Sequence, residues 1–211
     1  MNLFYVNKDP IVAASELPDK LVIKMVLETA QLLCTAHHEL DGESVNPDWQ
    51  LYKPTHANHP CAIWVRGTSS NYSWTYQHFV GLASEYQLRY GRQHFTYKKL
   101  GAHLACLPLN IQKPHDAGSF QLPAVCMPDE FKIDGSIVAS YQNYLANGKE
   151  YTKYGDGWGR RDAGRPDWAN DWQKYARCQA QLDQIREAVG LQTKRMQQLI
   201  KLLVSKAGGD L

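Results

Sequence analysis

Residues 18–38 read PDKLVIKMVLETAQLLCTAHH, and this stretch decides the fold class. On a helix with about 100° per residue, its polar side chains fall within one narrow arc: Lys20, Lys24, Glu28, Gln31, Thr35 and His38. Apolar side chains occupy most of the remaining circumference, whereas an ordinary surface helix has only an apolar stripe. We therefore predict that residues 18–38 form the central buried helix of a mainly α-helical domain. The polar arc lines either a solvent strip or a cleft.

Capping and stopping signals predict further helices on both sides of this one. Asp9 before Pro10 is typical of a helix start, Ser69 or Ser70 can cap a long helix, and Gly91 can end it. We expect helices at about 10–17, 60–67, 71–90, 96–107, 136–147, 166–189 and 192–205, with Gly190 breaking the last long one. Residues 3–6 form an edge strand or an extended segment, and residues 108–128 and 155–167 form loops.

Composition limits the class of protein. Hydrophobic residues make up 44% and charged residues 21% of the 211, the balance of an ordered globular chain. We expect one compact domain over residues 1–165 and a helical extension over 166–211 that packs on the domain or on a partner. The formal net charge of +2 excludes a global basic field for nucleic acid. The oligomeric state stays open.

The cysteines and the apolar pattern indicate a compartment. Five cysteines without a CxxC motif form neither a disulfide framework nor a standard zinc module, so reduced thiols in a cytosol are expected. The opening MNLFYVNKDP lacks the features of a signal peptide. Since no apolar run reaches 18 residues, we predict a cytoplasmic protein without membrane contact.

The densest group of potentially functional side chains lies in residues 51–66, LYKPTHANHPCAIWVR. A helix beginning at Pro60 would present free amide groups to an anion. Histidines suit acid/base work, and an arginine suits a carboxylate or phosphate. Facing the polar arc of residues 18–38, this segment would complete a cleft. We assign catalytic roles to Glu28, His56 and His59, and substrate binding to Lys24, Gln31, Tyr52, Thr55, Asn58, Arg66 and Asn71.

Structural roles compete with these assignments. Thr55, Asn58 and His59 are residue types that routinely cap turns and helices. The pair His56-x-x-His59 has no further ligand at a recognisable spacing, and zinc needs three or four, so neither a metal nor a cofactor is predicted. Cys61 is more typical of a buried packing cysteine than of a nucleophile.

A second candidate surface lies in the Gly/Arg-rich region 149–172. Arginines interleaved with tryptophans suit phosphate contact and base stacking. The predicted nucleic-acid contacts are Arg160, Arg161, Arg165 and Trp158. Nearby aspartates dilute the positive charge, and a loop anchored by tryptophans is an equal alternative.

Six motifs extend along residues 9–132. They are DP-x-x-AA (9–14), DK-x-x-x-KM-x-x-E-x-AQLL-x-TA (19–36), Y-K-x-T-H-x-NHPC-x-x-W-x-R (52–66), NY-x-W (71–74), EY-x-x-RYG (85–91) and MPDEFK (127–132). Together they resemble a family of small, largely uncharacterised proteins of tailed bacteriophages, over roughly residues 1–168. The resemblance implies a protein made in an infected bacterial cell, where such proteins often process nucleotides or modify DNA bases.

Two functions follow as hypotheses. The first is an enzyme that acts on a nucleotide or DNA base, by base modification or by glycosylase- or transferase-like chemistry, in a His/Glu/Asn/Arg cleft. The absence of GxGxxG, Walker A, HExxH and GxSxG motifs argues against dinucleotide, P-loop, zinc-protease and lipase chemistry. The alternative is a non-catalytic protein that binds a host protein or nucleic acid through residues 149–172, here called the Arg/Trp loop, and through the C-terminal helices.

Overall fold

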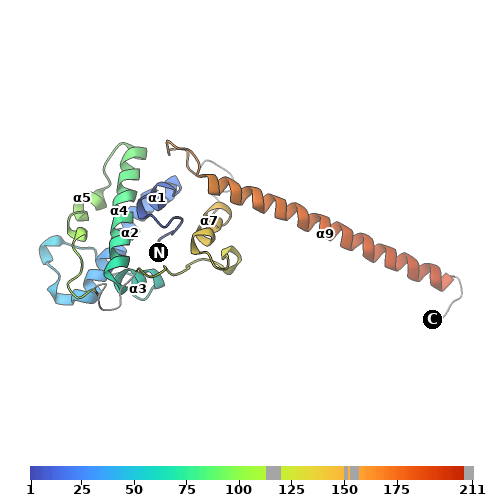
Figure 1. Cartoon of the computed structure of the whole chain (residues 1–211), viewed down its shortest axis with the longest axis horizontal. Coiled ribbons are helices and arrows are strands. Elements are labelled where there is room, and N and C mark those ends of the chain that lie inside the picture. Colours follow the sequence, from blue (N-terminus) through green and yellow to red (C-terminus); the bar gives the residue numbers. More distant parts are fainter. Residues whose placement is uncertain (113–119, 150–151, 153–156, 207–211) are drawn as a thin grey trace. The chain divides into compact units, whose positions relative to one another are not determined.

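The computed structural model describes residues 1–112, 120–149, 152 and 157–206. Its helices are α1 (Pro10–Ser15), α2 (Asp19–Asp41), α3 (Pro60–Gly67), α4 (Ser69–Tyr90), α5 (Phe95–Leu100), α7 (Ile137–Asn147) and α9 (Asp167–Lys206) (Figure 1). Short 3-10 helices are η1 (Gly42–Ser44), η2 (Pro47–Trp49), η3 (His103–Ala105) and η4 (Asp129–Phe131). Within these ranges there is no β-strand, which confirms the mainly α-helical prediction.

The chain divides into two compact units, Met1–Asn170 and Asp171–Leu211. In the first unit, α2 packs against α3, α4 and α5, and α1 packs against α4. Thirteen residues of α2 are buried, which confirms it as the central helix of the core. Two of its apolar residues, Ile23 and Leu27, were expected inside but are 42% and 39% exposed. They border the polar arc on the helix, within about 60° of Lys20, and so share its exposed face.

Local capping chemistry sets most helix ends. The Asp9 carboxylate accepts hydrogen bonds from the amides of Ile11 and Val12, as the sequence predicted. The cap of α4 is Thr68 rather than Ser69 or Ser70, since its hydroxyl accepts from the amide of Asn71 at 3.1 Å. Gly91 ends α4 in the left-handed region, with a φ of 68°.

Three predicted elements differ from the structure. Helix α9 continues through Gly190 without a break, because a glycine within a helix costs only about 1 kcal/mol and good helix formers flank it. The expected helix 96–107 is shorter, and η3 follows it after Gly101. Of the two forms predicted for residues 3–6, the edge strand is wrong, since these residues are buried and form no strand. Among the described helices, none is long and apolar enough to cross a membrane.

His78 lies in the core of the first unit and predicts an acid-sensitive fold. Its side chain is fully buried, stacks on Trp74, and donates from Nδ1 to the carbonyl of Pro10 at 2.9 Å. Burial lowers the pKa of His78 from 6.5 to about 4. Between these values the unfolded chain takes up a proton that the folded chain excludes, so stability falls as the pH drops from about 6.5 to about 4. The free energy of unfolding should fall by about 3 kcal/mol over this range.

Urea unfolding between pH 4 and pH 7 measures this effect. His78→Asn keeps a donor for Pro10 but does not titrate, so its free energy of unfolding should vary less with pH than that of the wild type. Parallel pH profiles for the two proteins would show that His78 is not the source.

Candidate functional site

The predicted site is built on the turn that leads into α3. The His59 ring caps this helix, with Nδ1 accepting from the amide of Cys61 at 3.2 Å. The His59 amide in turn donates to the carbonyl of His56 at 2.8 Å. Arg66, in the last turn of the helix, reaches back and donates to the carbonyl of Ala57 at 2.6 Å. The arginine therefore holds the turn that carries both histidines.

Hydrogen bonds from Thr35 and His38 of α2 fasten this segment to the central helix. The hydroxyl of Thr35 accepts from the amide of Thr55 at 3.1 Å, and Nε2 of His38 donates to the carbonyl of Tyr52 at 3.1 Å. Residues of the polar arc thus lie against the segment that the sequence singled out. The arc is partly a structural seam, since Thr35 is buried.

His56 has an unusual backbone. Its φ is +50°, in the left-handed region that non-glycine residues rarely adopt. Its side chain is exposed, and Nδ1 lies 2.7 Å from the hydroxyl of Thr55. Such conformations cluster at functional sites, and histidine is among the types that tolerate them in ordinary turns.

Glu28, His56 and His59 share one electrostatic neighbourhood. Burial lowers the pKa of His59, the N-terminal ammonium and the charge of His56 lower it further, and the carboxylate of Glu28 raises it. Glu28 forms an ion pair with Lys24 at 3.0 Å, and its side chain is 16% exposed against 65% for Lys24. Lys24 and Glu28 are thus paired on the polar arc of α2, and Thr35 and His38 of the same arc hold the segment that carries His56 and His59.

The other predicted substrate-binding residues differ in how far they are exposed to solvent. Asn71 is fully buried, donating to the carbonyl of Trp64 at 2.9 Å and accepting from the amide of Gln121 at 3.0 Å. Its position is structural, and the structure does not bring it to the site surface. The hydroxyl of Tyr52 lies 3.1 Å from that of Thr96. Gln31 is half-buried on α2, and Asn58 is exposed in the turn.

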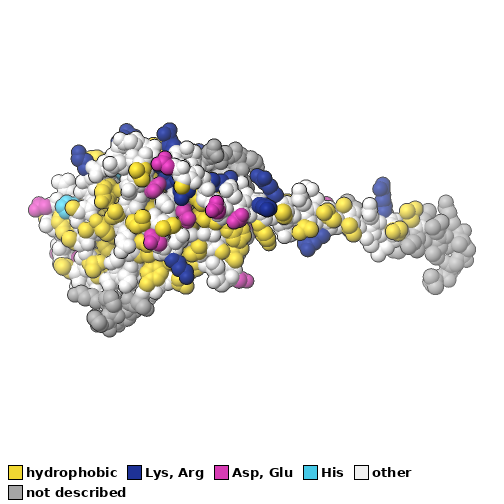
Figure 2. All heavy atoms as spheres, turned by 45° about the horizontal axis from the view of Figure 1, so that its top comes forward, with side chains coloured by type: hydrophobic (Ala, Val, Ile, Leu, Met, Phe, Trp, Pro, Cys, Tyr) yellow, Lys and Arg dark blue, Asp and Glu magenta, His cyan; other side chains and the backbone are white. Residues whose placement is uncertain are grey.

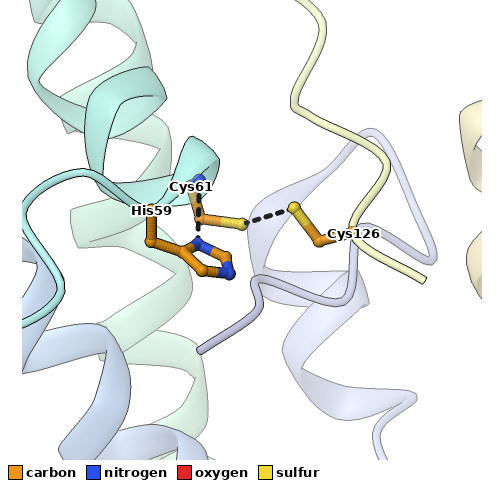
Figure 3. Close-up of side chains that lie close together, drawn as sticks. All are labelled: His59, Cys61 and Cys126. Carbon is orange, nitrogen blue, oxygen red and sulfur yellow. Dashed lines mark hydrogen bonds between the residues drawn. The ribbon is translucent and has the colours of Figure 1, made fainter.

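Cys126 lies next to the predicted site, although the sequence did not indicate it. Its sulfur accepts a hydrogen bond from the Cys61 thiol at 3.6 Å. Ligand atoms of His59, Cys61 and Cys126 all lie within 4.8 Å of one another, and Figure 3 shows the two sulfurs pointing toward each other beside the imidazole. The two cysteines are 65 residues apart, so no local spacing signals their meeting.

The contact between these cysteines separates their acidities. The hydrogen bond from Cys61 lowers the pKa of Cys126 to about 7, and the same bond, with burial, raises the pKa of Cys61. Cys61 is fully buried, as the sequence predicted. Cys126 is therefore the more reactive thiol at neutral pH, since the thiolate is both nucleophile and metal ligand.

Within the predicted Arg/Trp loop, residues 149–172, the structure describes residues 149, 152 and 157–172. Residues 150, 151 and 153–156 lie outside the described residues. Trp158 is 2% exposed and donates to the carbonyl of Glu16 at 2.8 Å. Arg161 donates to the carbonyls of Ser15 and Gly164, each at 2.8 Å. The Arg165 guanidinium lies 5.2 Å from the ring centre of Trp158. These contacts anchor the loop to the domain.

Arg160 differs from the rest of the loop. It is exposed, and its guanidinium lies 5.1 Å from the ring centre of Tyr90. Of the four predicted nucleic-acid contacts, Arg160 is thus the one whose side chain is exposed to solvent.

Comparison of the chain with known protein families, characterised proteins and solved structures finds no match.

Proposed function

We propose that the chain is a phage-type enzyme that acts on a nucleotide or a DNA base at the surface around the turn before α3, inside an infected bacterial cell. The observation that supports this most directly is the attachment of the turn with His56 and His59 to the polar arc of α2, which also carries Glu28, by hydrogen bonds from Thr35 and His38. Carboxylates and imidazoles placed close together can exchange protons with a bound substrate near neutral pH.

The surrounding residues suggest how a substrate is held. Lys24 projects from the same arc as Glu28 and is largely exposed, so its ammonium can meet a phosphate. Thr55 and Asn58 offer polar groups on the turn, and Arg66 keeps the turn in place. In this arrangement Glu28 or one of the two histidines transfers the proton, and Lys24 neutralises charge on the ligand.

A thermal-shift screen of the purified protein tests the proposal. The ligands are nucleotides, modified nucleosides and short DNA. A ligand that binds the native state raises the melting temperature, equivalent to about 2.7 kcal/mol at 100 times its Kd. We expect the shift to disappear in Glu28→Gln and His56→Ala and to persist in Gln87→Ala, an exposed substitution on α4.

Chemistry is then followed by the change in mass of the ligand on incubation with the protein. A shift that survives both site substitutions, or no shift with any ligand, would contradict the proposal.

The alternative of a non-catalytic binding protein has one observation in its favour. In the second unit, helix α9 exposes large apolar side chains, among them Leu182, Ile185 and Val189. Exposed apolar surface of this kind marks interaction sites. A ligand screen without any shift, combined with binding of a host protein or nucleic acid through α9, would favour this function.

A further inference from the structure

Three metal-ligating side chains converge beside the proposed active surface. In a tetrahedral zinc site with zinc–sulfur distances of about 2.3 Å, two sulfurs lie about 3.8 Å apart. The sulfurs of Cys61 and Cys126 are 3.6 Å apart, and the His59 ring nitrogen lies within 4.8 Å of both. The spacing of the sulfurs matches one edge of such a tetrahedron before any rearrangement.

Both segments that carry the cysteines are held in place by contacts with the rest of the first unit. Cys61 stands on the first turn of α3, which packs against α2. Around Cys126, the backbone amide donates to the hydroxyl of Tyr141 at 3.3 Å, and the carbonyl accepts from the side-chain amide of Asn2 at 2.7 Å. These bonds fix the loop that carries the second sulfur, so the ligands are positioned before a metal arrives.

We propose that His59, Cys61 and Cys126 bind one zinc ion, with the fourth position open to water or substrate. Two thiolates balance the charge of Zn²⁺, and their two protons are released on binding. Thiolate and imidazole ligands favour zinc over magnesium or calcium, and three protein ligands with an open position are typical of catalytic zinc. His59 would exchange its capping hydrogen bond or its ring proton for the metal, leaving proton transfer to Glu28 or His56.

Cobalt(II) absorption tests the zinc site without relying on activity. The reduced full-length chain is titrated with Co²⁺, and zinc is then added as competitor. We expect one equivalent to produce thiolate-to-cobalt charge-transfer bands and the visible bands of tetrahedral cobalt, and zinc to abolish both. Cys126→Ser should weaken cobalt binding by more than about 100-fold, whereas Cys106→Ser, which removes an exposed thiol, should leave it unchanged.

His59→Asn guards against misfolding as an explanation, because asparagine is itself a good helix cap. It should retain the melting temperature and lose the tetrahedral spectrum. Absence of the bands in the wild type, or their persistence in Cys126→Ser, would overturn the proposal. Because the readout is metal absorption, failure here leaves the ligand screen above unaffected.

An independent observation concerns the second unit. Its part of α9 carries apolar side chains that are half or more exposed: Tyr175 61%, Leu182 50%, Ile185 60%, Val189 56%, Met196 63% and Leu199 58%. Figure 2 shows hydrophobic side chains at intervals along this helix. An isolated helix without tertiary packing is marginal in water, so this one lacks the burial that usually stabilises a helix.

The spacing of these side chains is a heptad repeat. Tyr175, Leu182, Val189 and Met196 are seven residues apart, and Ile185 and Leu199 each follow one of them by three residues. Cys178 and Gln192 complete the second series and are exposed as well. A strict seven-residue repeat over more than three heptads is typical of a left-handed coiled coil. The partner is therefore another helix with the same repeat.

A second copy of this chain fits that requirement. In a parallel, in-register pair, Gln192 faces Gln192, so the two amides can hydrogen-bond, and Cys178 faces Cys178. The residues flanking the seam pair as Lys174 with Gln179, Gln181 with Arg186, and Ala188 with Thr193. None of these pairs brings like charges together, so self-pairing meets no electrostatic penalty at the seam. The geometry points to a homodimer through a two-stranded parallel coiled coil.

Sedimentation equilibrium of the full chain tests the dimer. We expect a mass twice the 24.0 kDa of one chain, reduced to that of the monomer by Leu182→Glu with Val189→Glu. Gln184→Glu with Gln198→Glu adds the same charge on the outward face and should leave the dimer intact. Mild oxidation should link two chains through Cys178, and Cys178→Ser should prevent it. A monomeric wild type, a trimer, or a dimer that survives the seam substitutions would overturn this arrangement.

Discussion

Replacing Arg89 with methionine is expected to lower the free energy of unfolding by about 3 kcal/mol or more. The guanidinium is buried and ties three segments together. It donates to the carbonyls of Ser15 and Leu17, each at 2.7 Å, and forms ion pairs with Asp19 at 3.0 Å and Glu85 at 2.8 Å. Methionine fills similar space but leaves two carbonyls and two carboxylates without their donor. Such groups are costly when partly buried.

Chemical denaturation monitored by circular dichroism measures the change. Arg92→Met is the matched control, because Arg92 is exposed and donates a single bond, to Tyr86, so its loss should cost no more than about 1 kcal/mol. Arg89→Lys keeps the charge without the planar fork and should recover only part of the stability. Equal stability of Arg89→Met and the wild type would mean that desolvation of the guanidinium cancels its interactions.

Replacing Trp158 with alanine should destabilise the first unit by about 3–5 kcal/mol. The indole is almost completely buried and lies edge-on to Trp168, with 5.9 Å between ring centres. Its Nε1 hydrogen bond to Glu16 joins the loop to the end of α1. Alanine would leave a cavity and remove that bond. The loss of stability should therefore appear as a lower melting temperature in the absence of any nucleic acid.

Arg160→Ala separates this structural role from binding. Arg160 is exposed and contacts the ring of Tyr90, so its removal should cost at most about 1 kcal/mol of stability. Fluorescence anisotropy with short DNA then asks whether the loop binds nucleic acid. If Trp158→Ala leaves the melting temperature unchanged, the loop is not an anchor of the fold.

Local signals were sufficient for the helical framework and for the segment that carries the site. The period of 3.6 residues identified α2 as a buried helix, because a helix with apolar side chains around most of its circumference must be enclosed. The cap at Asp9 and the stop at Gly91 were equally predictable, since each depends on hydrogen bonds or backbone angles within one turn. Residues 51–66 stood out because polar side chains gather there before a proline-initiated helix.

The same local reasoning was misleading where neighbouring forces outweigh a propensity. Gly190 was expected to stop a helix, but its cost is small beside the propensity of the helix formers around it. Ile23 and Leu27 were expected inside because they are apolar, although the boundary of the buried face depends on which elements cover α2. Asn71 was expected at the site from its place at a helix start, yet its amide is enclosed by Trp64 and Gln121.

The contacts between residues far apart in the sequence were decided by the tertiary structure alone. Cys126 reaches Cys61 because a loop far along the chain returns to α3 and is held there by Tyr141 and Asn2. The buried contacts of Trp158 and Arg89 likewise join segments about 70 residues or more apart. Periodicity and capping extend over a few residues only, so they can identify a helix and its exposed face. They carry no information on which distant side chains meet, because that depends on how all the helices pack together.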